Sequence, residues 1–334
     1  PAFTVGLPVR VRVVGSRACR LRGAPMPGVG GGDAVPRAPG EPRPGRATGV
    51  YAREKSLPPR LRADASLETV VAQADVIVMA VPSHGFRTVL GQLNHHLRPW
   101  VPVISLSKGL EQQTHLRMSQ LVQELLPGHP VGVLSGPNLA GEILAGRAAA
   151  SVLAMNDPAI VRQLQPLFSS GLFRVYTNTD IVGCELGGVL KNVIAIACGM
   201  GDGMGAGDNT RAAMITRGLA EITRLGVALG GSAETFAGLA GLGDLVATCT
   251  SPLSRNRHVG EQLGRGRSIG EILDEMSMVA EGVRSTPVAL ALAEAHGVAV
   301  PMIREVDRVL AGGSARQAFR ALLKISAGAE ADPG

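Results

Sequence analysis

The sequence predicts a first domain built on a mainly parallel β-sheet and a second domain made only of helices. Up to about residue 180, short apolar runs alternate with helix-like segments, which is typical of strands covered by helices on both faces. Beyond that point the strand-like runs disappear, and long segments with the helical spacing of apolar residues replace them. A length of 334 residues also agrees with two domains.

Four apolar runs are the predicted strands of the first domain. They cover residues 75–81, 102–106, 131–135 and 150–154. A helix is expected over residues 86–96, between the first two strands, and a short helix is expected before the fourth. The first three runs lead into the loops Ser83-His84, Ser107-Lys108-Gly109 and Gly136-Pro137-Asn138. Because ligands bind beyond the carboxyl ends of the strands in open α/β sheets, these loops are candidate parts of a site.

Five segments of the second domain have the apolar spacing of helices. They cover residues 181–200, 210–229, 269–277, 286–296 and 303–311. The change from strands to helices places the boundary near residues 177–180. The predicted domains are therefore residues 1–179 and 180–330.

The segment from about residue 15 to residue 56 is atypical of a packed domain. Its first 36 residues, 15–50, hold nine Gly, six Pro and six Arg and show no strand or helix periodicity, so we expect them not to pack on their own. An excess of Arg, Pro, Gly and Ala is typical of a GC-rich gene read out of frame. We interpret the segment as the product of two compensating frameshifts, which resequencing of the gene would test.

The charge distribution argues against a nucleic-acid partner. The net charge is +6, but residues 1–62 carry +9 and the remainder carries −3. Aromatic residues make up only 3% of the chain, so few rings are available for base stacking. No apolar run reaches the roughly 18 residues of a membrane span, and no signal peptide opens the chain, so we expect a cytoplasmic protein.

The four cysteines do not indicate a metal site. They are Cys19, Cys184, Cys198 and Cys249, and none of them forms a C-x-x-C pair. We interpret them as small buried hydrophobic residues, and no metal is expected.

Two lysines have contexts that suggest chemistry. Lys191 lies in the segment 189–197, which is apolar nearly all round a helix, so its amine should either reach out to solvent or face a polar cleft. In the second case burial would lower its pKa toward the range useful for a general acid or base. Lys108 follows a predicted buried strand and could meet a phosphate or a carbonyl oxygen, or it could be a solvated loop residue.

Two further segments could bind a ligand. Glycines at 238, 241 and 243 surround Asp244, and Thr248 follows one helical turn later. Glycine at this density allows close approach of backbone to backbone or to a ligand. In the segment Ser254–Arg257 a guanidinium stands beside an amide, which suits a phosphate ester or pyrophosphate. Taken singly, each of these segments could equally be a helix cap or a surface turn.

Taken together and in this order, seven blocks resemble the NAD(P)-dependent glycerol-3-phosphate dehydrogenases of the bacterial type. The blocks are Val81–Ser83, Ser107–Glu111, Gly136–Glu142, Leu190–Val193, Gly207–Thr210, Gly238–Leu245 and Ser254–Arg257. The resemblance runs from about Leu57 to the C-terminus. It implies a Rossmann-like doubly wound N-terminal domain, an all-α C-terminal domain and a homodimer.

The implied reaction is a reversible hydride transfer between NAD or NADP and C2 of dihydroxyacetone phosphate, which gives sn-glycerol 3-phosphate for glycerophospholipid synthesis. In the family, the lysine that matches Lys191 is the proton donor and acceptor at the C2 oxygen. Substrate-binding roles are implied for Lys108, Gly136, Asn138, Lys191, Asp244, Ser254, Arg255 and Asn256, although family members often carry a hydroxyl residue in place of Asn138. Cofactor-binding roles are implied for Lys108, Ala140, Arg255, Val279 and Glu281.

The chain departs from the family at the start of the first domain. Members open with a strand and the glycine pattern G-x-G-x-x-G, which brings the pyrophosphate onto a helix N-terminus. Here residues 11–14 are followed by Gly15, but Arg17 and Arg20 occupy the second and third glycine positions. If the protein carries this segment, we expect impaired dinucleotide affinity. The residues that select NAD or NADP also fall in it, so the choice between the two stays open.

Two other functions remain open at this stage. The first is another dehydrogenase of similar build, such as a 6-phosphogluconate or hydroxyacyl dehydrogenase relative, against which the Ser254–Arg257 block argues. The second is a non-catalytic relative with impaired cofactor binding that acts as a dimeric interaction module.

Overall fold

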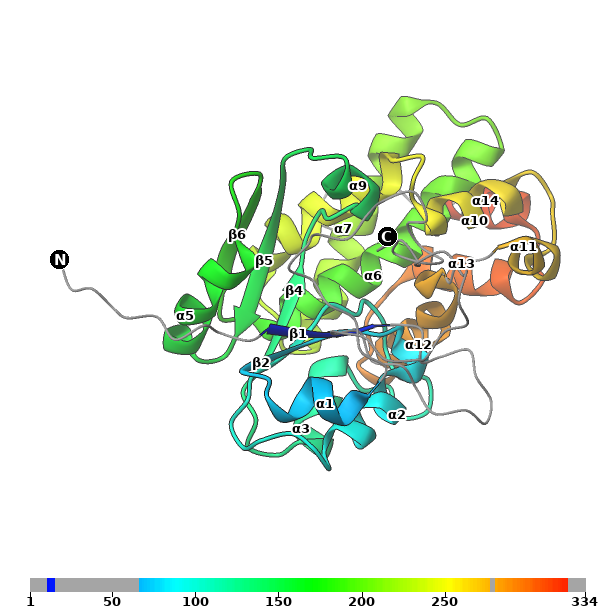
Figure 1. The fold of residues 1–334 in the computed structure, drawn as a ribbon. Helices are drawn as coiled ribbons and strands as arrows, with labels where there is room; N and C mark the ends of the chain where they lie inside the picture. The colour runs from blue at the N-terminus through cyan, green and yellow to red at the C-terminus, as the bar shows by residue number, and fades with distance from the viewer. Residues whose placement is uncertain (1–10, 16–65, 277–279, 324–334) are drawn as a thin grey trace, which may run out of the picture.

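The computed structural model describes residues 11–15, 66–276 and 280–323, and its first part is a six-stranded sheet with flanking helices (Figure 1). The strands lie in chain order across the sheet. They are β1 (Val11–Gly15), β2 (Val76–Ala80), β3 (Val103–Ser105), β4 (Val131–Ser135), β5 (Ala149–Met155) and β6 (Phe173–Asn178). The segment that we interpret as frameshifted lies outside the described residues, apart from Gly15 at the end of β1.

The sheet is parallel except at one pairing. Strands β1 to β4 pair in parallel, β5 runs antiparallel to β4, and β6 is parallel to β5. The mainly parallel sheet and its four predicted strands are therefore confirmed. Strand β6 was not predicted, because Val175 is its only fully buried residue and the segment contains no apolar run.

Helices cover both faces of this sheet, as expected for a Rossmann-like domain. The helices that connect its strands are α1 (Leu67–Ala72), α2 (Ser83–Leu93), α3 (Met118–Leu125), α4 (Ala140–Leu144) and α5 (Pro158–Phe168). Alternate residues of β2 enter different cores: Ile77 and Met79 pack with α1, α2 and α3, and Val76 and Val78 pack with α5. Coverage on both sides explains why the strands read as continuous apolar runs.

Helix α2 begins three residues before its predicted start. Pro82 is the N-cap residue, and Ser83 is the first residue of the helix. Proline is well suited to the beginning of a helix because it has no N–H to leave unpaired. Ser83 and His84 therefore form the first turn of α2, and their prediction as a loop was wrong.

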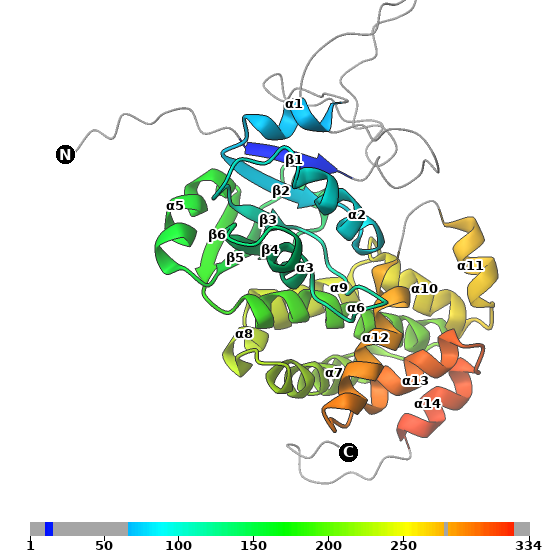
Figure 2. The ribbon, with the colours of Figure 1, turned by 90° about the horizontal axis from the view of Figure 1, so that it is seen from below.

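The second part of the chain is helical throughout its described residues and packs around one long central helix, α6 (Figure 2). Its helices are α6 (Ile181–Gly203), α7 (Asp208–Ala228), α8 (Ala233–Ala237), α9 (Asp244–Thr250), α10 (Arg255–Gly264), α11 (Ile269–Glu275), α12 (Glu281–Ala295), α13 (Pro301–Leu310) and α14 (Ala315–Leu323). A π-helical turn, Leu239–Gly243, leads directly into α9. The predicted boundary at residues 179/180 falls between β6 and α6, and the independence of the two domains stays a prediction.

Four of these helices, α8, α9, α10 and α14, were not predicted. Helix α10 shows why: its buried residues are Asn256, Val259, Gly260 and Leu263, which give a small and partly polar face instead of an apolar stripe. A periodicity argument cannot find a helix that packs through glycine and asparagine.

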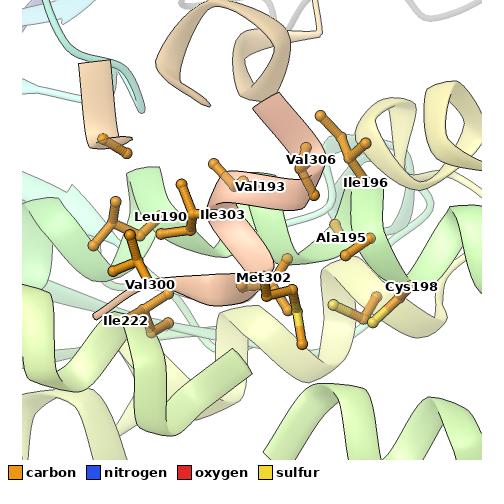
Figure 3. Close-up of a cluster of buried hydrophobic side chains, with 14 of the residues drawn as sticks. Leu190, Val193, Ala195, Ile196, Cys198, Ile222, Val300, Met302, Ile303 and Val306 are labelled. Atoms are coloured by element: carbon orange, nitrogen blue, oxygen red, sulfur yellow. The ribbon is translucent and has the colours of Figure 1, made fainter. Parts of the chain in front are cut away.

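The core of the helical domain surrounds α6. Leu190, Val193 and Ile196 of α6 meet Ile303 and other residues of α13 in Figure 3. By length and composition α6 could cross a membrane, but 94% of its most apolar stretch is buried inside the protein. Cys184, Cys198 and Cys249 are buried and free, as expected, whereas Cys19 lies outside the described residues.

Glycines allow α6 and α10 to pack backbone against backbone. A Cβ atom on Gly199 of α6 would overlap the carbonyl oxygen of Arg257 in α10, and a Cβ on Gly260 of α10 would overlap the carbonyl oxygen of Ile196 in α6. Gly203 and Gly264 repeat this reciprocal contact one turn further along the two helices. The close approach fixes the N-terminus of α10 beside the middle of α6.

Substituting Gly260 with alanine is expected to lower the free energy of unfolding by about 3 kcal/mol, because the added methyl group collides with rigid backbone. Urea unfolding would measure the change. Gly270→Ala in α11 is the matched control, since a Cβ there meets nothing within 4 Å. If the two variants had equal stability, the tight packing of α6 on α10 would be contradicted.

Candidate active site

Lys191 lies in the buried middle of α6 and points at a carboxylate. Its side chain is only 7% exposed, and its Nζ donates to Asp244 Oδ1 at 2.6 Å and to the hydroxyl of Thr248. Thr248 in turn donates to the carbonyl oxygen of Asp244 at 2.7 Å. Of the two possibilities left open by the sequence, the structure therefore shows an amine held by polar partners and not one that reaches bulk solvent.

Lys108 reaches the same carboxylate from the other domain. It lies in the loop after β3, and its Nζ donates to Asp244 Oδ2 at 2.7 Å. It also donates to the carbonyl oxygen of Gly136 and to Asn138 Oδ1, both at 3.0 Å. The alternative of a solvated loop lysine is thus wrong. Five predicted site residues come together here: Lys108, Gly136, Asn138, Lys191 and Asp244.

The electrostatics of this cluster favour a proton-exchanging amine. Burial lowers the pKa of Lys191 to about 8, and the positive charge of Lys108 lowers it as well. The carboxylate of Asp244 acts in the opposite direction and raises the pKa. With its pKa lowered to about 8, Lys191 can exchange its proton near neutral pH.

Glycines make room for Lys108. Gly136 has φ +134°, a conformation that side chains rarely adopt, and this turn presents its carbonyl oxygen to Lys108. On α6, a Cβ at Gly188 would lie 2.6 Å from Ser135 Oγ and 3.5 Å from Cγ of Lys108. The stem of Lys108 therefore passes directly over the glycine face of α6.

The predicted phosphate-binding segment forms the start of α10. Ser254 is the N-cap and accepts from the backbone N–H of Arg257 at 3.2 Å, and Arg255 is the exposed first residue of the helix. The Asn256 side chain is used within the protein, since its Nδ2 donates to Asn192 Oδ1 and its Oδ1 accepts from the N–H of Gly282, both at 3.0 Å. Asn256 therefore ties α6, α10 and α12 together.

The described residues expected to line the cofactor come from several elements of the structure. Ala140 is exposed at the first position of α4. Glu281 is the first residue of α12 and accepts two hydrogen bonds from Ser83. Val279 lies outside the described residues. Residues 16–20, where this chain departs from the family's glycine pattern, lie outside them as well. Among the described residues no group of three or more His, Cys, Asp or Glu is placed to hold a metal ion.

Three residues with no role assigned from the sequence bond to predicted site residues, although Ser83 and Thr248 lie in candidate segments. Thr248 had a signal, because it stands one helical turn after Asp244. Asn192 directly follows Lys191 and holds Asn256. Ser83 had no signal for its partner, since Glu281 is 198 residues away in the chain.

These features define a class of protein. Parallel strands whose carboxyl ends carry a lysine loop form the ligand-binding edge of a dinucleotide-binding domain. The facing helical domain supplies a buried amine of lowered pKa, which suits proton transfer to a carbonyl oxygen. The fold and the site are those of a two-domain nicotinamide-dependent dehydrogenase.

Comparisons with known proteins identify the family. The profile described as NAD-dependent glycerol-3-phosphate dehydrogenase N-terminus matches residues 46–161, and the profile of the C-terminus of the same enzymes matches residues 180–320. The chain belongs to the NAD-dependent glycerol-3-phosphate dehydrogenase family. The first match begins at residue 46, so most of the atypical N-terminal segment lies outside it.

Individual relatives agree with this assignment. The chain is 67% identical to a glycerol-3-phosphate dehydrogenase [NAD(P)+] of Sphingopyxis alaskensis, over 84% of each chain. It is 57% identical to one of Mycobacterium avium, over 79% of this chain and 77% of that protein. Among solved structures, glycerol-3-phosphate dehydrogenase of Coxiella burnetii has a TM-score of 0.80 and 36% identity, covering 83% of this chain and 86% of that one.

Proposed function

We propose that this chain catalyses the reversible, NAD(P)-dependent reduction of dihydroxyacetone phosphate to sn-glycerol 3-phosphate. The observation that carries the proposal is the Lys191–Asp244–Lys108 cluster, which one carboxylate assembles from residues of both domains. The close relatives named as glycerol-3-phosphate dehydrogenases [NAD(P)+] support the same substrate and cofactor.

Lys191 is the proposed proton donor and acceptor. When the reduced dinucleotide is bound, its nicotinamide supplies the hydride that reaches C2 of the substrate. Negative charge then develops on the C2 oxygen, and the ammonium of Lys191 donates a proton to it. In the reverse direction the neutral amine takes that proton back. Asp244 and Thr248 hold the amine in place, and Lys108 adds positive charge near the developing oxyanion.

The start of α10 is the proposed site for the substrate phosphate. The guanidinium of Arg255 and the first-turn N–H groups of α10, at the positive end of the helix dipole, suit a doubly charged phosphate monoester. Ser254 is a proposed phosphate contact because it is the N-cap residue at this end of α10. Asn256 supports the site by holding α10 against α6. Asn138 and Gly136 are the remaining proposed substrate-binding residues, and both accept hydrogen bonds from Lys108.

The described residues fit a nicotinamide dinucleotide at the adjoining sheet edge. Gly15 pairs with Ala80, and Met79 pairs with Ser105, so the carboxyl ends of β1, β2 and β3 lie side by side. Lys108 follows one of these ends, and Arg255 offers a second cation for the phosphates of the cofactor. Ala140, Val279 and Glu281 are the other proposed cofactor contacts.

The rate of each direction is expected to depend oppositely on pH. Since the pKa of Lys191 is lowered to about 8, its ammonium form is lost as pH rises through that value. Reduction of the ketone needs the ammonium and should slow above about pH 8, whereas oxidation of the alcohol needs the neutral amine and should speed up. Profiles of kcat against pH in both directions would measure this, and parallel profiles would contradict the assignment.

The activity is tested by mixing the protein with NADH or NADPH and dihydroxyacetone phosphate and following loss of the reduced nicotinamide. Dihydroxyacetone without the phosphate is the control substrate, and it should react far more slowly because it cannot use the α10 site. Turnover of neither cofactor, with cofactor binding intact by fluorescence titration, would support the non-catalytic alternative. No observation on the described residues favours that alternative at present.

We further propose a cytoplasmic homodimer whose product supplies glycerophospholipid synthesis. These assignments rest on the family resemblance alone. Size-exclusion chromatography with light scattering tests the dimer, and a monomeric mass would reject it.

A further inference from the structure

We infer that Glu281 and Ser83 form a latch between the two domains that positions Lys108 for the reaction. Glu281, at the start of α12 in the helical domain, accepts from the backbone N–H of Ser83 at 3.1 Å and from its hydroxyl at 2.7 Å. Ser83 is the first residue of α2 in the sheet domain, and it is buried. Both oxygens of one carboxylate thus accept hydrogen bonds from a single residue of the other domain.

The latch contacts the loop that carries Lys108. A Cβ on Gly109, the next residue along, would lie 2.5 Å from Cβ of Ser83, 2.6 Å from its Oγ and 3.1 Å from Oε2 of Glu281. The backbone of Gly109 is therefore pressed against the hydrogen-bonded pair. Any opening of the pair frees the loop, and with it the ammonium that must reach Asp244 in the opposite domain.

The helical side of the latch is fixed to the proposed phosphate site. Gly282 follows Glu281 and donates its N–H to Asn256 Oδ1, while Asn256 Nδ2 donates to Asn192 beside Lys191. A continuous series of hydrogen bonds thus runs from the start of α10, through α12, to the start of α2. This connection makes Glu281 a positioning residue whose effect reaches the substrate through Lys108.

The latch rests on the proposed function and differs from the cofactor-lining role that the family resemblance implies for Glu281. If Glu281 acted only by touching the cofactor, removal of the Ser83 hydroxyl would have no effect on turnover. If it acts as a latch, Ser83 and Glu281 must be energetically coupled, because each is the partner of the other.

Three variants and one control test the latch. Ser83→Ala removes one of the two hydrogen bonds, Glu281→Ala removes both, and the double variant combines them. Glu281→Gln is the conservative rescue, because its amide can accept from the Ser83 N–H and donate to the hydroxyl. Thr88→Ala, at an exposed position of the same helix, is the matched control.

Two readouts are needed. The first is kcat with dihydroxyacetone phosphate, measured beside the Kd of the cofactor. Ser83→Ala should lower kcat roughly tenfold, as expected for one hydrogen bond to a charged group, and leave cofactor affinity within about twofold. The double variant should be no worse than Glu281→Ala, and Glu281→Gln should recover most of the rate.

The second readout is hydrogen–deuterium exchange of the segment around Lys108 and Gly109, which should accelerate in Ser83→Ala and not in Thr88→Ala.

The outcomes separate the two proposals. Unchanged kcat and unchanged exchange in Ser83→Ala would overturn the latch, as would additive effects of Ser83→Ala and Glu281→Ala. Loss of cofactor affinity in Glu281→Ala with no change in Ser83→Ala would leave Glu281 as a cofactor contact only and overturn the latch. If the parent protein lacked turnover, the proposed function would fail, while the exchange experiment would still decide whether the latch holds the loop.

Discussion

Replacing Lys191 with methionine is expected to lower kcat by about 10²- to 10⁴-fold, the usual contribution of a positioned general acid or base. Methionine fills the space of the lysine stem but has no proton to give to the C2 oxygen. Affinity for NAD(P)H should stay close to that of the parent, because the amine contacts Asp244 and Thr248 and not the strand ends where the cofactor is proposed to bind. Steady-state kinetics with a fluorescence titration would measure both quantities.

Lys191→Arg separates the charge of this residue from its proton. The guanidinium keeps a positive charge at this position but does not release a proton at accessible pH. If Lys191 served only to stabilise charge, the arginine variant would keep much of its rate. A near-parental kcat in Lys191→Met, with the folded structure intact by circular dichroism, would remove Lys191 from the mechanism.

Asp244→Asn is expected to produce the second large effect, because it removes the carboxylate that both lysines share. The amide cannot balance two positive charges, so kcat should fall by about 10²-fold or more. The free energy of unfolding should fall by about 3 kcal/mol, the range for a buried ion pair that loses one partner. Since Asp244 raises the pKa of Lys191, its loss should also move the pH profile of the remaining activity to lower pH.

The matched control for this variant is Asp274→Asn, which removes the same charge at an exposed position of α11. It should leave kcat and the stability within experimental error of the parent. Urea unfolding, kcat and its pH dependence would be measured for both variants. An Asp244→Asn protein with parental stability and an unshifted profile would mean that the carboxylate does not hold the two ammonium groups.

The sequence predicts most of the scaffold because its signals are local. Strands β2 to β5 are apolar runs, since the sheet is covered on both faces, and α6 is recognisable from its nearly continuous apolar composition. Strand β6 and helix α10 are not predicted, because β6 is mostly exposed and α10 packs through glycines. Both elements are stabilised by contacts with residues far away in the sequence, which local patterns do not show.

The candidate site, too, is predicted from the sequence only in part. Lys191 can be singled out from the sequence because a charge inside an apolar helix is unfavourable without a partner. The structure shows that this partner is Asp244. The pairing with Lys108 requires the two domains to be placed against each other, which residue spacing cannot give. The Asn256 side chain, implied by the resemblance to bind substrate, also bonds Asn192 and Gly282, and its contact with substrate stays a prediction. Only the tertiary structure shows how its donors and acceptors are used.

The most direct test of the account is the pKa of the Lys191 amine in the folded protein. The chain contains only four lysines, so lysine-selective isotope labelling gives a simple NMR spectrum, and the Lys191→Met variant assigns the signal. A titration of the side-chain resonance should show a pKa lowered from 10.5 to about 8, as burial and the nearby charge of Lys108 require. A Lys191 amine that titrated with the ordinary pKa of a solvated lysine would contradict the proposed proton transfer.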